Sequence, residues 1–284
     1  VNQCVSITKD FDGKTVSHLR ALPKNLRFIS EDGKGVRESK VLYEAMCIAA
    51  EKGLTVMSHA EDMDLSATDY RLAENLETAR NVYLSASTGA KLHMCHVSTK
   101  EALEDILTAK RRGGNVTFEV TPHHIWFCHN EFRVNPPIRQ QADMDALIRA
   151  MLADEVDAIA TDHAPHSREE KDRPLTQAPS GILGLETALA LGITNLVKPG
   201  HLTLLELMEK MSYNPARLYK LNCGRMEAGA PADLVLFDAD RQWTVEGFES
   251  KSSNSPFLGA TLTGKVMYTV CKGRIVYGDQ GTEV

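Results

Sequence analysis

The feature of this sequence that most constrains its fold is a repeated order of segments from the amino end to about residue 200. A short apolar run ends in polar or ionisable residues, and a segment with helical periodicity follows it. The runs have the near-continuous apolar character of parallel strands that are covered on both faces. This alternation predicts an α/β fold with a parallel sheet. The expected strands are Cys4–Thr8, Leu26–Ser30, Leu54–Ser58, Lys91–Cys95, Val116–Val120 and Val156–Ala160.

The segments between these strands have the periodicity and the end signals of helices. Gly53 marks the turn before the strand at Leu54, and Gly113 and Gly114 mark the turn before Val116. The expected helices are Ser39–Lys52, Ala73–Thr88, Lys100–Arg112 and Asp143–Leu152.

Two parallel-sheet architectures are compatible with this order, an open doubly wound sheet and a closed (β/α)8 barrel. The glycine fingerprint GxGxxG follows none of the expected strands, so the dinucleotide-binding form of the open sheet has no support. Ionisable residues follow several of the strands, and such groups converge on one mouth only when the sheet closes. The sequence therefore favours a TIM-type (β/α)8 barrel.

A complete barrel needs eight strands, and six candidates precede residue 200, so we expect about two further strand–helix units on the amino side of Val1. After residue 230 the pattern changes to short, alternating, β-branched segments separated by turns. We therefore expect a barrel domain over residues 1–230, incomplete at its amino end, and strands of a small β-sandwich-like domain over residues 231–284. The segments expected to form these last strands are Ala232–Phe237, Trp243–Val245, Lys265–Val270 and Arg274–Tyr277.

Charge and composition narrow the classes of partner. The formal net charge of -6 gives no sign of a polyanion-binding face, so we expect no nucleic-acid partner. No apolar run approaches the roughly 20 residues that cross a bilayer, so we expect no membrane span. The six cysteines are scattered without a CxxC pair, which indicates reduced thiols and a cytoplasmic location, with a disulfide framework as the alternative.

Four residues at strand ends have the chemistry of metal ligands. His59 and His96 follow two successive strands, and neutral imidazoles in that position suit zinc or a similar borderline cation. A single strand-end histidine is more often structural, but two on successive strands favour ligation. Asp162 follows the sixth strand, where a carboxylate can bind metal and also accept a proton. Asp32 is the fourth candidate, although Ser-Glu-Asp-Gly is also a good turn sequence.

The other histidines and the charged clusters carry weaker signals. His123 and His124 are adjacent, so both cannot face the same mouth, and we expect them to pack or to support the ligands. His93 has no supporting context, and we expect a core or surface residue. The cluster Arg168–Lys171 predicts a solvated loop, with a lid as the alternative. No GxSxG motif occurs, so serine-hydrolase chemistry has no support.

Short runs with polar and ionisable residues occur along the chain in the order Ser30–Gly33, His59–Asp62, Cys95–Thr99, Glu119–His124, Asn135–Arg139, Ala160–His166 and Gly229–Leu234. In this order and at this spacing the runs resemble those of bacterial dihydroorotases. Each run alone is shared with hydantoinases and allantoinases, whereas the full set is far more specific. Hydantoinases usually bridge their metals with a carboxylated lysine, but the corresponding strand end here carries Asp32, as in dihydroorotases that bridge with aspartate. The resemblance implies a metal-dependent amidohydrolase barrel.

The resemblance also implies a role for each matching residue. Asp32 would bridge two zinc ions, and His59 and His96 would bind one of them. Asp162 would bind the other ion and act as general base. The substrate would contact Asn135, His166 and the backbone at Pro179 and Gly181.

Two parts of the family pattern differ here. The family has His-x-His on the first barrel strand with a carboxylate-binding arginine close behind, and no His-x-His occurs in this sequence. We therefore expect one firmly bound zinc ion instead of two, and little or no turnover by this chain alone. Ser180 stands where the family often has an aromatic residue.

The activity implied by the resemblance is the reversible hydrolysis of the cyclic amide of dihydroorotate to N-carbamoyl-aspartate, a reaction of pyrimidine biosynthesis. One alternative is another cyclic amidohydrolase, a hydantoinase or an allantoinase. A second is a noncatalytic dihydroorotase homologue that acts as a scaffold. The expected partner is a small-molecule substrate, and a homodimer or an association with another pyrimidine-pathway enzyme is left open.

Overall fold

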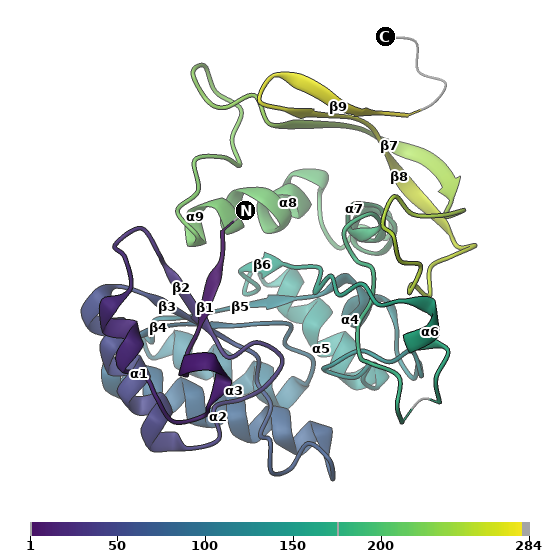
Figure 1. The fold of residues 1–284 in the computed structure, drawn as a ribbon. Coiled ribbons are helices and arrows are strands. Elements are labelled where there is room, and N and C mark those ends of the chain that lie inside the picture. The colour runs from purple at the N-terminus through teal and green to yellow at the C-terminus, as the bar shows by residue number, and fades with distance from the viewer. Residues whose placement is uncertain (1, 175, 280–284) are drawn as a thin grey trace. The chain divides into compact units, whose positions relative to one another are not determined.

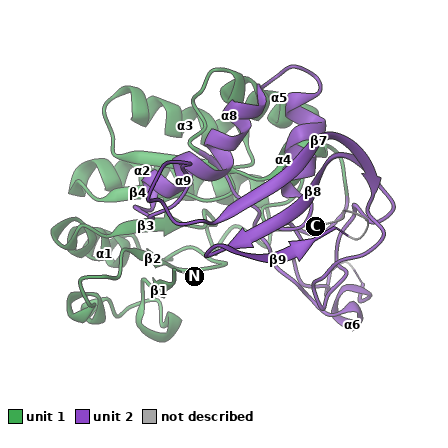
Figure 2. Ribbon diagram, turned by 90° about the horizontal axis from the view of Figure 1, so that it is seen from above, with its two compact units in different colours: residues 1–130, 135–157 green, residues 131–134, 158–284 purple. Residues whose placement is uncertain are grey.

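A computed structural model describes residues 2–174 and 176–279. Val1 and residues 280–284, at the ends of the two expected domains, lie outside the described residues. The chain divides into two compact units, which Figure 2 shows in different colours: Val1–Asn130 with Asn135–Asp157, and Glu131–Val134 with Ala158–Val284. These units are defined by contacts between residues, whereas the predicted boundary at residue 230 is defined by a change in the sequence pattern. The boundary at residue 230 therefore stays a prediction.

The first unit is built on parallel strands that pair in chain order (Figure 1). Each strand lies within a run that the sequence predicts as a strand. In the register of the sheet Ser30 lies beside Met57 and Ser58 beside Met94, so the carboxyl ends lie along one edge. The strands of this unit are β1 (Cys4–Ser6), β2 (Phe28–Ser30), β3 (Thr55–Ser58), β4 (Lys91–Met94) and β5 (Val116–Val120).

Helices α1 (Ser39–Lys52), α2 (Tyr70–Thr88) and α3 (Lys100–Arg111) connect these strands and lie against one face of them (Figure 1). Helix α2 begins three residues before its predicted start because the Asp69 side chain accepts hydrogen bonds from the first turn. Gly53, at the end of α1, has a left-handed φ of 68°, which favours glycine. The unit also contains α4 (Pro122–Trp126), α5 (Gln141–Leu152) and the short 3-10 helices η1 (Lys9–Phe11) and η2 (Ser17–Ala21).

The two faces of the strands differ in chemistry. Val56, Leu92 and Phe118 are almost fully buried. In the register of the sheet, His93 and Thr117 lie one residue along their strands from the row of these apolar residues. Because side chains alternate along a strand, the apolar residues occupy one face and the polar ones the other. The core of this unit therefore lies between the strands and helices, while the second face presents polar groups.

The second unit contains β6 (Ala158–Ile159), the sixth of the expected strands. Its helical segments are α6 (Arg168–Lys171), α7 (Ala188–Gly192), the π-helical turn η3 (Ile193–Val197), α8 (Leu204–Met208), the π-helical turn η4 (Glu209–Tyr213) and α9 (Asn214–Leu218). An antiparallel sheet completes the unit, with strands β7 (Leu234–Thr244), β8 (Thr261–Cys271) and β9 (Arg274–Gly278) in that order. Two of the predicted segments join into β7, because a register irregularity between Asp238 and Gln242 lets pairing with β8 resume.

No helix in the described ranges is long and apolar enough to cross a membrane. The six cysteines all lie in the part of the chain that the structure describes, and none of them forms a disulfide there.

Candidate metal and substrate site

Two of the predicted metal ligands lie together at the carboxyl ends of β3 and β4. His59 Nδ1 is 2.9 Å from His96 Nε2, and the two rings meet edge to face with their centroids 4.8 Å apart. Both side chains are buried. Two nitrogens bound to one zinc ion at about 2.0–2.1 Å lie roughly 3.0–3.4 Å apart, so this pair is spaced almost as two zinc ligands would be.

Glu61 and Asn135 complete the surroundings of His59. Glu61 Oε2 lies 2.8 Å from His59 Nε2, and the Asn135 amide donates to the same oxygen at 2.8 Å. Burial raises the pKa of Glu61, but the hydrogen bonds from His59 and Asn135 outweigh this effect. The pKa of Glu61 therefore lies below its ordinary value. An ionised carboxylate on Nε2 holds the proton there and leaves Nδ1 of His59 as the ligand nitrogen.

The two ring nitrogens of the buried His96 differ in their contacts, and Nε2 is the one that faces His59. The pKa of His96 is well below the ordinary value because the ring is buried and lies beside His59, so the imidazole is neutral. Its Nδ1 is buried and has no hydrogen-bond partner among the described residues. His96 also has a φ of 37°, a left-handed conformation that costs a non-glycine residue about 1–3 kcal/mol and that often occurs at functional sites.

The segment after His96 is held by a buried carboxylate on α2. Glu74 accepts hydrogen bonds from the backbone N–H groups of Ser98, at 2.8 Å, and Thr99, at 3.1 Å. The Ser98 hydroxyl also donates to Glu74, and Arg139 donates to it at 2.8 Å. Because Glu74 is almost fully buried, these donors compensate its charge and fix the backbone beside His96.

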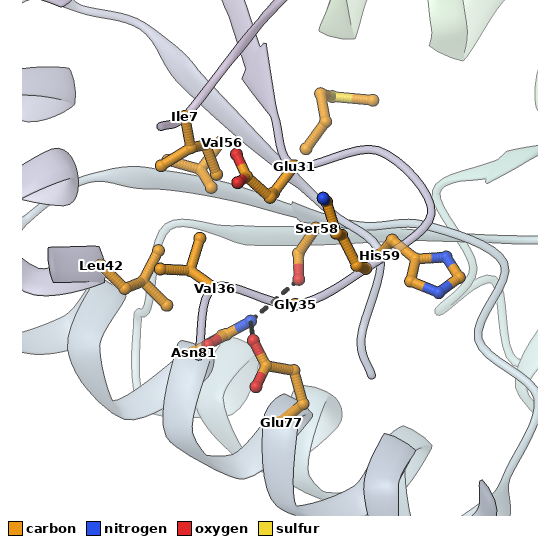
Figure 3. Close-up of a pocket in the computed structure, with 12 residues that line it drawn as sticks. Ile7, Glu31, Gly35, Val36, Leu42, Val56, Ser58, His59, Glu77 and Asn81 are labelled. Carbon is orange, nitrogen blue, oxygen red and sulfur yellow. Dashed lines mark hydrogen bonds between the residues drawn. The ribbon is translucent and has the colours of Figure 1, made fainter. Parts of the chain in front are cut away.

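A second network lies behind His59, in the pocket that Figure 3 shows. The Asn81 amide donates to Ser58 Oγ at 2.9 Å and to Glu77 Oε1 at 3.0 Å. Burial raises the pKa of Glu77 to about 7, although Arg80 and Asn81 oppose the shift. A Cβ atom on Gly35 would lie 2.2 Å from the Glu61 carbonyl oxygen, so only glycine allows this close approach.

His123 and His124, which we expected to pack or to support the ligands, are both buried. His124 Nδ1 lies 2.7 Å from Thr121 Oγ1, and His124 Nε2 donates to the Pro136 carbonyl at 3.0 Å. Burial is the main reason why the pKa of His124 falls to about 4, so the ring is neutral. His124 thereby supports the segment that carries Asn135.

Asp32 follows β2, and its side chain is exposed. In the described ranges no hydrogen bond or ion pair joins Asp32 to His59 or His96. Burial raises the pKa of the Cys4 thiol, and the negative charge of Asp32 raises it by a smaller amount. The preceding residue, Glu31, is buried and accepts a hydrogen bond from the Thr8 backbone N–H at 2.9 Å, which ties β2 to the segment after β1.

The remaining predicted site residues lie in the second unit. Asp162 follows β6 with a φ of 47°, so it shares the left-handed backbone of His96. His166 Nε2 donates to the Ser180 carbonyl at 2.8 Å, and His166 Nδ1 lies 3.9 Å from Glu170 Oε2. Gly181 has a φ of 148°, and a Cβ atom there would lie 2.7 Å from the His166 ring. The structure therefore brings His166 and Gly181 together.

Two residues that had no predicted site role, Lys171 and Asn254, organise this segment. Lys171 donates to the carbonyl oxygens of Arg133, Pro179 and Gly181, each at 3.1 Å. Asn254 donates to the Gly181 carbonyl at 3.1 Å. The Gly181 N–H donates to the Arg133 carbonyl at 3.0 Å, whereas the Pro179 carbonyl has a second lone pair for a ligand.

The cluster Arg168–Lys171 forms a short helix where a loop was predicted, and its predicted solvation agrees with the absence of buried residues in this helix. The Ser167 side chain caps it, and burial lowers the pKa of Lys171. A lysine that points inward to backbone carbonyls cannot be distinguished from a solvated one by composition alone. Glu61, which lies in the run His59–Asp62, also had no predicted role. Only its position two residues after His59 could have suggested its contact with the His59 ring.

The sequence profile of the amidohydrolase family matches residues 32–276. The chain is 47% identical to a dihydroorotase from Clostridium botulinum in an alignment of 283 positions that covers 98% of this chain and 70% of that protein. It is 42% identical to a dihydroorotase from Clostridioides difficile, with 98% of this chain and 72% of that protein covered. The chain therefore belongs to the amidohydrolase family. Within that family it belongs with the bacterial dihydroorotases, as its motifs predicted.

Solved structures show the same fold. A D-hydantoinase superposes with a TM-score of 0.85 at 21% identity, covering 98% of this chain and 70% of that chain. An L-hydantoinase from Arthrobacter aurescens superposes with a TM-score of 0.80 at 26% identity, covering 91% of this chain and 65% of that chain. The chain thus spans about two thirds of the length of these structures. The likeness confirms the predicted α/β amidohydrolase fold of the TIM-barrel type.

Proposed function

We propose that the protein carrying this chain is a dihydroorotase, which reversibly hydrolyses the cyclic amide of dihydroorotate to N-carbamoyl-aspartate. The observation that carries the proposal is the His59–His96 nitrogen pair, buried at the carboxyl ends of β3 and β4. It occurs in a chain whose known relatives at 42–47% identity are dihydroorotases. The cytoplasm is the proposed compartment, and an oligomer or a pathway partner stays open.

His59 and His96 would hold a zinc ion, and Asp32 and Asp162 would contribute carboxylates. The neutral state of His96 supports a bound cation, because a neutral imidazole has one nitrogen lone pair to give to a metal ion. When bound, zinc would polarise the substrate carbonyl and activate a water molecule. One firmly bound ion is the proposed stoichiometry for the ligands of this chain.

The chain's own residues supply proton transfer and orientation. Asp162 would accept the proton of the attacking water and return it to the ring nitrogen as the carbon–nitrogen bond breaks, so that the elements of water are added across the amide. Asn135 would contact the substrate from its position beside Glu61 and His59. His166 would face the substrate carboxylate, and the backbone at Pro179 and Gly181 would face the ring.

The proposal is tested by metal analysis and turnover of the natural protein that carries this chain. Zinc should co-purify, a chelator should stop dihydroorotate hydrolysis, and added zinc should restore it. His59→Asn and His96→Asn should each lose both zinc and turnover. His201→Asn is the matched control, because His201 lies just before α8 and belongs to none of the networks described above. A protein that keeps full turnover after both site substitutions would contradict the metal assignment.

A further inference from the structure

A second group of possible ligands lies on the polar face of β4 and β5. His93 and Cys95 are two residues apart, so their side chains leave the strand on the same side. In the sheet register His93 lies beside Thr117, which places Glu119 near Cys95. His93 and Glu119 are buried, and Cys95 is half-buried.

The ligand atoms of His93, Cys95 and Glu119 all lie within 4.8 Å of one another. His93 Nε2 is 3.0 Å from Glu119 Oε2, and His93 Nδ1 is 2.8 Å from Thr117 Oγ1. We infer that His93, Cys95 and Glu119 bind a borderline divalent cation such as Zn²⁺, at a site separate from the His59–His96 pair. This inference does not depend on the proposed dihydroorotase activity.

The donor set selects the class of cation. Zinc binds imidazole nitrogen at about 2.0–2.1 Å, thiolate sulfur at about 2.3 Å and carboxylate oxygen at about 2.0–2.2 Å. Atoms bound to one such ion lie roughly 3–4 Å apart, so small side-chain rotations bring this group into range. Magnesium and calcium prefer all-oxygen sites and are disfavoured by the nitrogen and sulfur donors.

Thr117 supports ligation through Nε2 of His93. When Nδ1–H donates to the Thr117 hydroxyl, the tautomer is fixed and Nε2 presents its lone pair toward Glu119. In the other tautomer the Thr117 hydroxyl donates to Nδ1, and the neutral His93 donates Nε2–H to Glu119 across the 3.0 Å contact. Either this proton or the metal ion therefore lies between His93 and Glu119. The thiol of Cys95 beside them favours the metal ion.

Cobalt distinguishes this site from the His59–His96 pair, because a thiolate bound to Co²⁺ gives a sulfur-to-metal charge-transfer absorption in the near ultraviolet. We expect this band when Co²⁺ is added to the chelator-treated protein, and we expect it to persist in His59→Asn. Cys95→Ser should abolish it. Glu119→Gln should weaken Co²⁺ binding by about tenfold or more, the loss that follows even from removing an outer partner of a ligand. Cys47→Ser is the matched control and should keep the band.

A second measurement uses the unmodified protein and covers the case in which Cys95→Ser does not fold. Alkylation of each cysteine is followed by mass spectrometry with and without Zn²⁺. Zinc should slow the alkylation of Cys95 by about tenfold or more, while the exposed Cys4 and Cys271 should react at unchanged rates. Absence of the cobalt band at saturation, its survival in Cys95→Ser, or equal alkylation of Cys95 with and without zinc would show that a proton and no metal joins His93 to Glu119.

Discussion

At the scale of single residues, the site depends on carboxylates that hold histidines in one orientation. Glu61 holds His59, and the hydrogen bonds that Glu61 accepts keep it ionised. A neutral amide at this position would present either a weaker acceptor or an N–H donor to His59 Nε2. The tautomer that exposes Nδ1 would then be less favoured.

Glu61→Gln should therefore weaken zinc binding by about 10–100-fold while leaving the fold intact. Competition with a zinc-binding dye measures the affinity, and circular dichroism measures the fold. Asp64→Asn is the control, because Asp64 is exposed and its ion pair with Arg37 lies at the surface. Unchanged zinc affinity in Glu61→Gln would remove Glu61 from the site.

Asp162→Asn should lower kcat for dihydroorotate by about 10²–10⁴-fold, because the amide keeps the shape of the side chain but cannot accept the proton of water. Steady-state kinetics on the natural protein measure the loss. Asp172→Asn, at an exposed position on the same segment, should keep the parental kcat. A rate near the parental value in Asp162→Asn would exclude the general-base role.

The sequence indicated His59, His96 and Asn135 because each lies in a motif at a strand end or in a loop. It did not indicate His93, Glu119 or Lys171, since their roles depend on contacts across strands or with backbone carbonyls. A polar residue in a strand looks the same in the sequence whether its side chain lies on a buried face or on a solvated face of the sheet. The burial of His93 could be read only from the folded sheet.

At the scale of secondary structure, the strands and the long helices follow from hydrophobic periodicity and end signals. Helix α1 has the predicted bounds because apolar spacing and Gly53 agree on them. The short helices α4 and α6 were not predicted, since four or five residues are too few for a periodic pattern. Their positions depend instead on capping by Thr121 and Ser167.

Helix α2 carries a buried carboxyl group with an unusual pH dependence. The pKa of Glu77 is raised from 4.5 to about 7, so the folded state binds a proton more tightly than the unfolded state does. Stability from this group is fully present below about pH 4.5 and is lost as the pH rises toward 7 and beyond. The loss amounts to at most roughly 3–4 kcal/mol.

Glu77→Gln should remove this part of the pH dependence, which urea denaturation at several pH values between about 4.5 and 8 would measure. Glu44→Gln, on the exposed side of α1, should leave it unchanged. If the two variants show the same slope of unfolding free energy against pH, Glu77 stays ionised beside Arg80 throughout this range.

The segment from Pro179 to Gly181 depends on a backbone conformation that glycine alone adopts easily. Gly181→Ala would place a Cβ atom 2.7 Å from the His166 ring at a φ of 148°, so it should lower the free energy of unfolding by roughly 1–3 kcal/mol. Gly247→Ala meets no atom within 4 Å and should change stability by less than about 0.5 kcal/mol. Equal stability of the two variants, measured by chemical denaturation, would contradict this account.

At the scale of the whole molecule, the ordered set of motifs along the chain is sufficient to indicate the family. The match to dihydroorotases over 98% of the chain and the TM-score of 0.85 to a D-hydantoinase confirm the family and the fold. The motifs alone could not separate dihydroorotases from hydantoinases at each position, because the strand-end histidines serve both. The separation rests on the whole set and on Asp32.

The central claim is that this chain belongs to an enzyme that acts on dihydroorotate. The most direct measurement compares kcat/KM of the zinc-loaded natural protein for dihydroorotate, hydantoin and allantoin. We expect turnover of dihydroorotate, in both directions, with little turnover of the other two substrates, and we expect His96→Asn to abolish it. Preferred turnover of hydantoin or allantoin, or no turnover of any of the three with zinc bound, would contradict the account.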